Sequence, residues 1–359
     1  MAAFRFAGGE GDPQPRAQRR SPADRARHRT GEPVYILAIF SDRPSWACGR
    51  RAVSALHAVI KEMLMYLTGF ADEAAPDIDG QIRAIKELGW RNIEARAIDG
   101  VNITDISEEK FEELCLKLDE AGIMINCFGS AVANWAKKLS DPPDSSYEEL
   151  RRAIPRMRRL ETHLIRVMSF AVPEDASINE PEVVEEVIRR MRELVRIAED
   201  GGITLVHENC DNWGGRSHEH TLRLLDAIPS PNFRLVFDTG NPVFRKDVRG
   251  DPPYRYQNAW EYYTNVKEHI VYVHIKDGKV FGDQVRYTFP GEGDGHVKKI
   301  LADLHKSGYD GGISIEPHLA VVYHDSTKQT DASIRYENFV EYGRRIEKLC
   351  HDAGWKDFK

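Results

Sequence analysis

The chain has 359 residues, 41% of them hydrophobic and 30% charged, with a mean hydropathy of -0.50, which predicts a soluble globular protein with a full core. No run approaches the ~18 consecutive apolar residues that indicate a transmembrane helix. The net charge is -7. Because residues 1–62 carry +5, the remaining residues carry -12, and such an acidic body is poorly suited to binding nucleic acid. The five cysteines are odd in number, scattered and never in a C-x-x-C pair, which argues against a disulfide scaffold or zinc knuckle and favours the reducing cytoplasm.

Residues 1–62 differ from the remainder of the sequence. The segment "RAQRRSPADRARHRTGEP" is rich in Arg, Pro and small polar residues and shows no apolar periodicity. Its acidic residues are unusual for an Arg-rich targeting peptide. We therefore expect residues 1–62 to be a disordered extension, or to result from a start codon assigned upstream of Met63 or Met65, and residues 63–359 to form the folded domain.

From Met65 onward, apolar strand-like runs alternate with amphipathic helical patterns. The strand-like runs occupy residues 65–73, 90–98, 123–132, 164–172, 203–209, 233–241, 270–277 and 311–318. The helical patterns occupy residues 77–89, 107–122, 147–163, 180–202, 219–228, 259–269, 296–308 and 335–350. Eight strand–helix units predict a parallel sheet closed into a (β/α)8 TIM barrel. A doubly wound open sheet would need a G-x-G-x-x-G turn after the first strand, and "TGFADEAAP" is no such turn.

Ionisable residues end the last four strands. The apolar run 203–206 finishes in "HENCD", and Glu208, Asp238, His274 and Glu316 occupy corresponding places on strands five to eight. Barrel active sites lie at the carboxyl ends of the strands, so these side chains share one rim. Three carboxylates and one imidazole would repel one another unless a cation lay among them. This donor set predicts a divalent metal, Mn²⁺ or Mg²⁺ first and Co²⁺ or Zn²⁺ as alternatives, with open positions for substrate oxygens.

The motifs "HEN", "FDTGN", "HIKD" and "IEPH", with "GFADE" on the first strand and "GEGDGH" after the seventh, resemble the xylose isomerase-like TIM barrels called sugar phosphate isomerase/epimerases. That superfamily includes ketose 3-epimerases, hydroxypyruvate isomerase, inosose dehydratase and an apurinic endonuclease branch. The resemblance implies that Glu208, Asp238, His274 and Glu316 bind the metal. It also implies that Glu208 and Glu316 act as an acid/base pair on opposite sides of the substrate.

Such a site supports several reactions of a keto-sugar. A metal that chelates a carbonyl and a neighbouring hydroxyl acidifies the adjacent C–H, and a carboxylate can then remove the proton. Its return on the opposite face is epimerisation, its return to the neighbouring carbon is isomerisation, and loss of a β-hydroxyl is dehydration. The sequence leaves these outcomes open, with isomerase or epimerase as the principal prediction and an inosose dehydratase-like lyase as the alternative.

Departures from the ketose 3-epimerase pattern argue against ordinary ketohexose 3-epimerisation. Asn241 stands where those enzymes resemble one another in having a histidine, and Lys276 stands near their arginine position, with Arg286 the nearest arginine. The acidic loop "GEGDGH" brings Glu292 and Asp294, which would repel a phosphate. We therefore predict an unphosphorylated sugar, keto-sugar or cyclitol.

Further candidates for substrate contact lie on the predicted strands and loops. Glu94, His207 and His318 are candidates for binding substrate hydroxyls, in addition to Asn241, Lys276 and Arg286. Aromatic side chains available for stacking on a sugar ring are Phe70, Trp135 and Trp213. The expected partner is a small-molecule carbohydrate, with no membrane or nucleic acid, and homo-oligomers are common among similar barrels.

Two other function classes compete with a sugar isomerase. An apurinic-endonuclease-type phosphodiesterase would need extra histidines on strands two to four, which end in "EARAID", "CFGSAV" and "SFAV". A non-catalytic sugar-binding barrel would not need two carboxylates facing each other across a metal. Both classes are disfavoured by these patterns.

Overall fold

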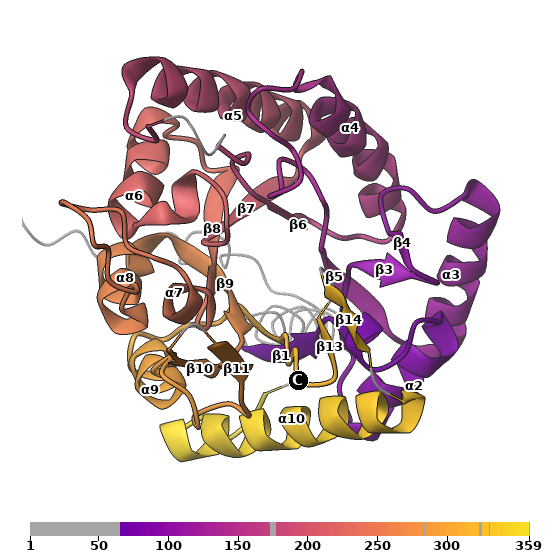
Figure 1. Ribbon diagram of the computed structural model, residues 1–359. Coiled ribbons are helices and arrows are strands. Elements are labelled where there is room, and N and C mark those ends of the chain that lie inside the picture. The colour runs from indigo at the N-terminus through magenta and orange to yellow at the C-terminus, as the bar shows by residue number, and fades with distance from the viewer. Residues whose placement is uncertain (1–64, 173–176, 283, 323–324, 330, 359) are drawn as a thin grey trace, which may run out of the picture. The chain divides into compact units, whose positions relative to one another are not determined.

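The computed structural model describes residues 65–172, 177–282, 284–322, 325–329 and 331–358. Eight parallel strands form a barrel within this part of the chain, as Figure 1 shows. In chain order they are β1 (Tyr66–Gly69), β2 (Asn92–Ala95), β5 (Met124–Phe128), β6 (Leu164–Val167), β7 (Thr204–Glu208), β8 (Phe233–Asp238), β9 (Ile270–Ile275) and β12 (Gly312–Ile315). The predicted (β/α)8 fold is confirmed, whereas the prediction for residues 1–62 lies outside the described residues.

From β2 to β12, each barrel strand pairs in parallel with the next barrel strand, and β12 pairs with β1. The remaining gap, between β1 and β2, is joined by a single parallel bridge between Phe70 and Glu94. Helices surround the strands (Figure 1). They are α2 (Ile78–Glu87), α3 (Glu108–Ala121), α4 (Asp144–Arg159), α5 (Pro181–Gly201), α6 (His218–Ala227), α8 (Ala259–Val266), α9 (Val297–Lys306) and α10 (Ala332–Ala353).

Local sequence signals explain where these helices start and stop. The Ser107 hydroxyl accepts a hydrogen bond from the Lys110 amide at 3.1 Å and caps α3. Gly122 follows α3 with φ +66°, a left-handed conformation that glycine adopts without steric cost. Helix α4 begins at Asp144, three residues before the expected start, and continues through Pro155. Among the described helices, none is long and apolar enough to cross a bilayer.

Side chains inside the barrel form layers because successive residues of a strand point to opposite faces. Cys127, Val206, Val236 and Tyr272 make up one small apolar cluster. On β7, β8 and β9, the residues two positions further along the strand are Glu208, Asp238 and His274. An apolar layer therefore underlies a layer of ionisable groups at the carboxyl ends of the strands, called the rim below.

Short elements that the sequence did not predict lie beyond the ends of barrel strands, and a further turn, η4, completes the helical segment predicted at 259–269. Three two-stranded hairpins follow β2, β9 and β12, and helical turns follow β1, β7, β8 and α8. The hairpins are β3 (Ala97–Ile98) with β4 (Val101–Asn102), β10 (Gly278–Phe281) with β11 (Gln284–Tyr287), and β13 (Val321–Val322) with β14 (Asp325–Gln329). The turns are η2 (Ala71–Glu73), η3 (Gly214–Arg216), α7 (Asn241–Phe244) and η4 (Lys267–His269).

Candidate metal centre

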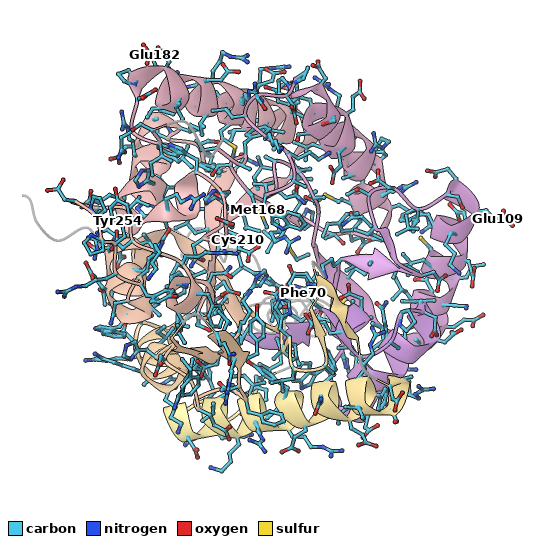
Figure 2. All side chains as sticks on the ribbon, in the orientation of Figure 1. Phe70, Glu109, Met168, Glu182, Cys210 and Tyr254 are labelled. Atoms are coloured by element: carbon cyan, nitrogen blue, oxygen red, sulfur yellow. The ribbon has the colours of Figure 1, made fainter. Side chains whose placement is uncertain are left out.

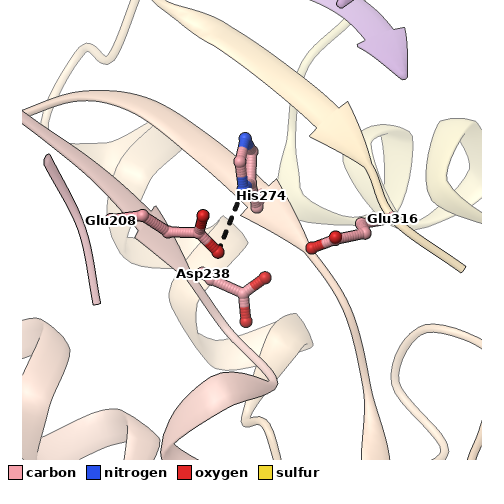
Figure 3. A group of neighbouring side chains, drawn as sticks. All are labelled: Glu208, Asp238, His274 and Glu316. Carbon is pink, nitrogen blue, oxygen red and sulfur yellow. Dashed lines mark ion pairs between the residues drawn. The ribbon is translucent and has the colours of Figure 1, made fainter. Parts of the chain in front are cut away.

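The structure brings the four predicted rim residues together. Glu208, Asp238 and His274 lie on β7, β8 and β9, and Glu316 directly follows β12. Each offers a ligand atom, and these atoms all lie within 4.8 Å of one another. All four side chains are buried. In Figure 3, Glu208 and Glu316 approach the centre of the group from opposite sides, with His274 and Asp238 between them.

Asp238 is oriented by the backbone that follows β8. Its Oδ1 accepts hydrogen bonds from the amides of Gly240 at 2.8 Å and Asn241 at 2.6 Å. The Asn209 amide group binds the backbone of Asp238 on both sides, at 2.7 and 2.9 Å. Burial, reinforced by Glu316 and Glu208, raises the pKa of Asp238 to about 6 despite the nearby Lys276 ammonium. The fixed Oδ1 leaves Oδ2 to face the centre of the group.

His274 is oriented from across the barrel by Glu94. Its Nε2 lies 3.1 and 3.0 Å from the two carboxylate oxygens of Glu94, both side chains being fully buried. The Nε2–H therefore donates to Glu94, which leaves Nδ1 toward Glu208 at 3.8 Å. Although burial opposes it, the charges of Glu94 and Glu208 raise the pKa of His274 to about 10. A carboxylate behind a histidine is the usual arrangement that fixes a metal-binding imidazole.

Glu208 lies beside one amide, one guanidinium and the His274 imidazole. The Asn241 Nδ2 donates to its Oε1 at 2.9 Å, and Arg166 Nη1 lies 3.4 Å from its Oε2. Burial would raise the pKa of Glu208, but Arg166 and His274 lower it to about 2. The carboxylate is therefore ionised at neutral pH.

Glu316 is held by cations on both of its oxygens. Oε2 accepts from Lys276 Nζ at 2.8 Å, and Oε1 accepts from Arg96 Nη1 at 3.1 Å, with His318 Nε2 at 3.5 Å. Burial is outweighed by Lys276, His318 and Arg96, which hold the pKa of Glu316 well below its usual range. Glu316 is thus ionised as well.

The residues present fit a divalent cation. Within the described residues, three buried atoms of this group make no hydrogen bond, although two of them have a cation nearby: Glu208 Oε2, with Arg166 at 3.4 Å, Asp238 Oδ2, with Lys276 at 3.0 Å, and His274 Nδ1. Unpartnered buried polar atoms are costly and rare in folded proteins. Three carboxylates with one imidazole form a donor set suited to Mn²⁺ or Mg²⁺. Glu208, Asp238, His274 and Glu316 are therefore the residues that would hold the ion.

A second group able to bind a metal, Glu73, Glu316 and His318, shares Glu316 with the first. Its Glu73 carboxylate already accepts from the His318 amide at 2.8 Å, from His318 Nδ1 at 2.9 Å and from Arg96 Nη2 at 3.1 Å. These contacts satisfy both Glu73 oxygens within the protein. The first group fits a metal better because three of its side-chain atoms make no hydrogen bond to the described residues.

The other predicted substrate-contact residues are distributed unevenly. Lys276 and Asn241 lie within the rim and contact its carboxylates. Arg286 is exposed on β11 and packs over the Phe281 ring at 5.0 Å. His207 points away from the rim, with its Nε2 3.0 Å from Ser169 Oγ, and burial lowers its pKa to about 4. Glu94 binds His274 from within the barrel rather than facing the opening.

Of the aromatic and acidic candidates for substrate contact, some lie at the rim and others lie away from it. Phe70 is buried at the rim, with its ring centroid 5.0 Å from that of His274. Trp213 is buried and donates to the Ile178 carbonyl at 2.7 Å, whereas Trp135 is 41% exposed. Glu292 is exposed and pairs with Arg345 on α10 at 2.6 Å. The expected repulsion of a phosphate by Glu292 therefore lacks support, because this side chain is engaged away from the rim.

Two buried arginines at the rim were not among the predicted site residues. Arg96 binds Asp72 through Nε at 2.8 Å and Nη2 at 3.1 Å, and its guanidinium lies 4.4 Å from the Phe70 ring centroid. Arg166 lies 5.3 Å from the same centroid and donates to the Ser130 carbonyl at 2.9 Å. A signal existed for Arg166, since a charged residue inside the apolar strand "LIRV" calls for a buried partner.

Comparison with known proteins gives a family match. Residues 82–337 match the model of the family described as "Xylose isomerase-like TIM barrel". The uncharacterized protein MJ1311 of Methanocaldococcus jannaschii is 30% identical over 172 residues, which are 47% of this chain and 55% of that protein. The chain thus spans about half the length of this curated relative.

Solved structures share the fold at low sequence identity. A D-allulose 3-epimerase from Methylomonas sp., in complex with D-allulose, has a TM-score of 0.58 and 17% identity, covering 80% of this chain and 98% of that chain. A xylose isomerase-like TIM barrel protein from Mycobacterium smegmatis, in complex with magnesium, has a TM-score of 0.57 and 17% identity, with the same coverage of 80% and 98%.

Proposed function

Because the chain belongs to the xylose isomerase-like TIM barrel family, as its motifs predicted, we propose that it is a divalent-metal-dependent isomerase or epimerase. Its substrate would be an unphosphorylated keto-sugar or related carbohydrate, converted through an enediolate. The observation that carries the proposal is the placement of Glu208 and Glu316 on opposite sides of one buried group of possible metal ligands (Figure 3). The structural neighbours that contain magnesium and D-allulose support the same proposal.

The proposed chemistry divides the work among four side chains. When bound, the ion would polarise a carbonyl and a neighbouring hydroxyl and stabilise the negative charge that develops beside them. Glu208 and Glu316 are both ionised, so either can accept a proton from carbon. Their opposite positions suit removal on one face of a substrate and return on the other, which inverts the carbon. Asp238 and His274 serve as ligands only.

The test uses proton exchange with solvent. The protein is incubated with Mn²⁺ in deuterium oxide and a pool of keto-sugars and keto-cyclitols, and NMR follows deuterium incorporation. Glu208→Gln should lower exchange by roughly 100-fold or more, the scale of losing a general base. Asp238→Asn should act through metal affinity and be partly rescued by excess Mn²⁺. Glu292→Gln, an exposed change at a residue paired with Arg345, is the matched control.

Each competing function has its own signature in this experiment. Loss of a β-hydroxyl from a keto-cyclitol would identify the dehydratase alternative. Sugar binding without any exchange would identify a non-catalytic barrel, and bound metal in a multi-ion ratio with phosphodiesterase activity would identify the endonuclease class. Normal exchange by Glu208→Gln, or full rescue by Mn²⁺, would refute the assignment of Glu208 as the base.

A further inference from the structure

Lys276 places a positive charge inside the candidate metal centre. It follows β9, and its Nζ lies 2.8 Å from Glu316 Oε2 and 3.0 Å from Asp238 Oδ2. The side chain is buried, so these two carboxylates have no competing solvent contact there. Two of the four candidate ligands are thus paired by one ammonium.

The backbone directs Lys276 into this position. Its amide donates to Thr239 Oγ1 at 3.2 Å, and its carbonyl accepts from the same hydroxyl at 2.7 Å. The Lys276 stem passes so close to Gly240 that a Cβ there would lie 2.8 Å from the lysine Cγ. Residue 240 must therefore be small for the stem to follow this path. The segments that directly follow β8 and β9 therefore fix the path of the lysine side chain toward the two carboxylates.

The oxygens that Lys276 contacts are the ones a metal would need. Asp238 Oδ1 is committed to the amides of Gly240 and Asn241, which leaves Oδ2. Glu316 Oε1 is committed to Arg96, which leaves Oε2. A cation entering the centre meets Lys276 on both remaining oxygens, and two positive charges at that distance repel strongly in a buried site.

We propose that Lys276 is a built-in competitor of the metal ion. In the metal-free chain its ammonium pairs with both Asp238 and Glu316, and metal binding would displace it from them. This inference rests on the proposed function, because it presumes that the four residues bind a divalent ion. It predicts that the same ligands without the lysine bind the ion more tightly, and that the metal-free protein without the lysine is less stable.

The experiment compares Mn²⁺ affinity by isothermal titration calorimetry. Lys276→Met should lower the Kd for Mn²⁺ at least tenfold relative to the wild-type protein. Lys276→Gln removes the same charge with a polar side chain and replaces Lys276→Met if the latter does not fold. Lys279→Met, which removes a lysine from the neighbouring hairpin strand β10, is the control and should leave the Kd unchanged.

Thermal unfolding provides an independent readout. Without metal, Lys276→Met should melt at a lower temperature than the wild type, and saturating Mn²⁺ should raise its melting temperature by more. An unchanged or weaker Mn²⁺ affinity in whichever Lys276 variant folds overturns this inference alone. Absence of Mn²⁺ binding by both the wild type and the variants overturns it together with the proposed metal dependence.

Discussion

The pairing of Glu94 with His274 gives a measurable prediction about metal affinity. Both Glu94 oxygens lie within 3.1 Å of His274 Nε2, and both side chains are fully buried. Glu94→Gln keeps the volume and one acceptor oxygen but removes the charge. A hydrogen bond to a charged group contributes about 1.5–3 kcal/mol, and each 1.4 kcal/mol is about tenfold in binding. If most of this energy fixes the imidazole for metal binding, Mn²⁺ affinity should fall by about 10- to 100-fold.

Calorimetric titration of Mn²⁺ into the wild type and Glu94→Gln measures this change directly. Glu87→Gln is a suitable control, because Glu87 pairs with Tyr336 and Arg344 on the outer surface of the barrel. Thermal unfolding without metal shows whether the variant folds. A folded Glu94→Gln protein with wild-type Mn²⁺ affinity would show that Glu94 does not prepare His274 for a metal.

Three further predictions address the loop after β11, pH and the N-terminal segment. Gly293→Ala should lower the free energy of unfolding by at least ~1 kcal/mol in urea titration, since its Cβ would lie 2.1 Å from Asp277 Oδ1. Burial lowers the pKa of His220 to about 4, so the unfolded chain binds more protons than the folded chain between about pH 6.5 and 4. The free energy of unfolding should therefore decrease as the pH is lowered from about 6.5 to 4, and it should decrease less in His220→Gln. Deleting residues 1–62, which contain none of the eight predicted units, should leave folding and Mn²⁺ affinity intact, and aggregation or metal loss would contradict this.

The four-residue group at the rim was predictable because strand direction alone places it. In a barrel of parallel strands, residues that end successive strands must share one edge, whatever the side-chain details. Glu208, Asp238, His274 and Glu316 therefore needed only correct strand boundaries. Strand alternation would also have separated His207 from Glu208, since adjacent residues point to opposite faces, and the structure places His207 beside Ser169 instead.

The sequence patterns could not predict which side chains contact one another across the barrel. Glu94 on β2 reaches His274 on β9, and Arg96 reaches Glu316, although neither pair lies on neighbouring strands. Such contacts depend on the width of the closed barrel and on side-chain conformations. The local sequence around Glu94 reveals a carboxylate at a strand end, which is equally compatible with contacting a substrate hydroxyl or a histidine.

The two carboxylates assigned to acid/base chemistry are held unequally, which bears on their roles. Glu316 has Arg96 at 3.1 Å and Lys276 at 2.8 Å, and Arg96 is itself fixed by two carboxylates of η2. Glu208 has one neutral amide, Arg166 at 3.4 Å and His274 at 3.8 Å, and both of these distances are too long for a strong charge-assisted hydrogen bond. A carboxylate with weaker fixed contacts needs less rearrangement to accept a proton from a substrate carbon. This asymmetry favours Glu208 as the first base and makes Glu208→Gln a sharper test of the proposed chemistry than the same change at Glu316.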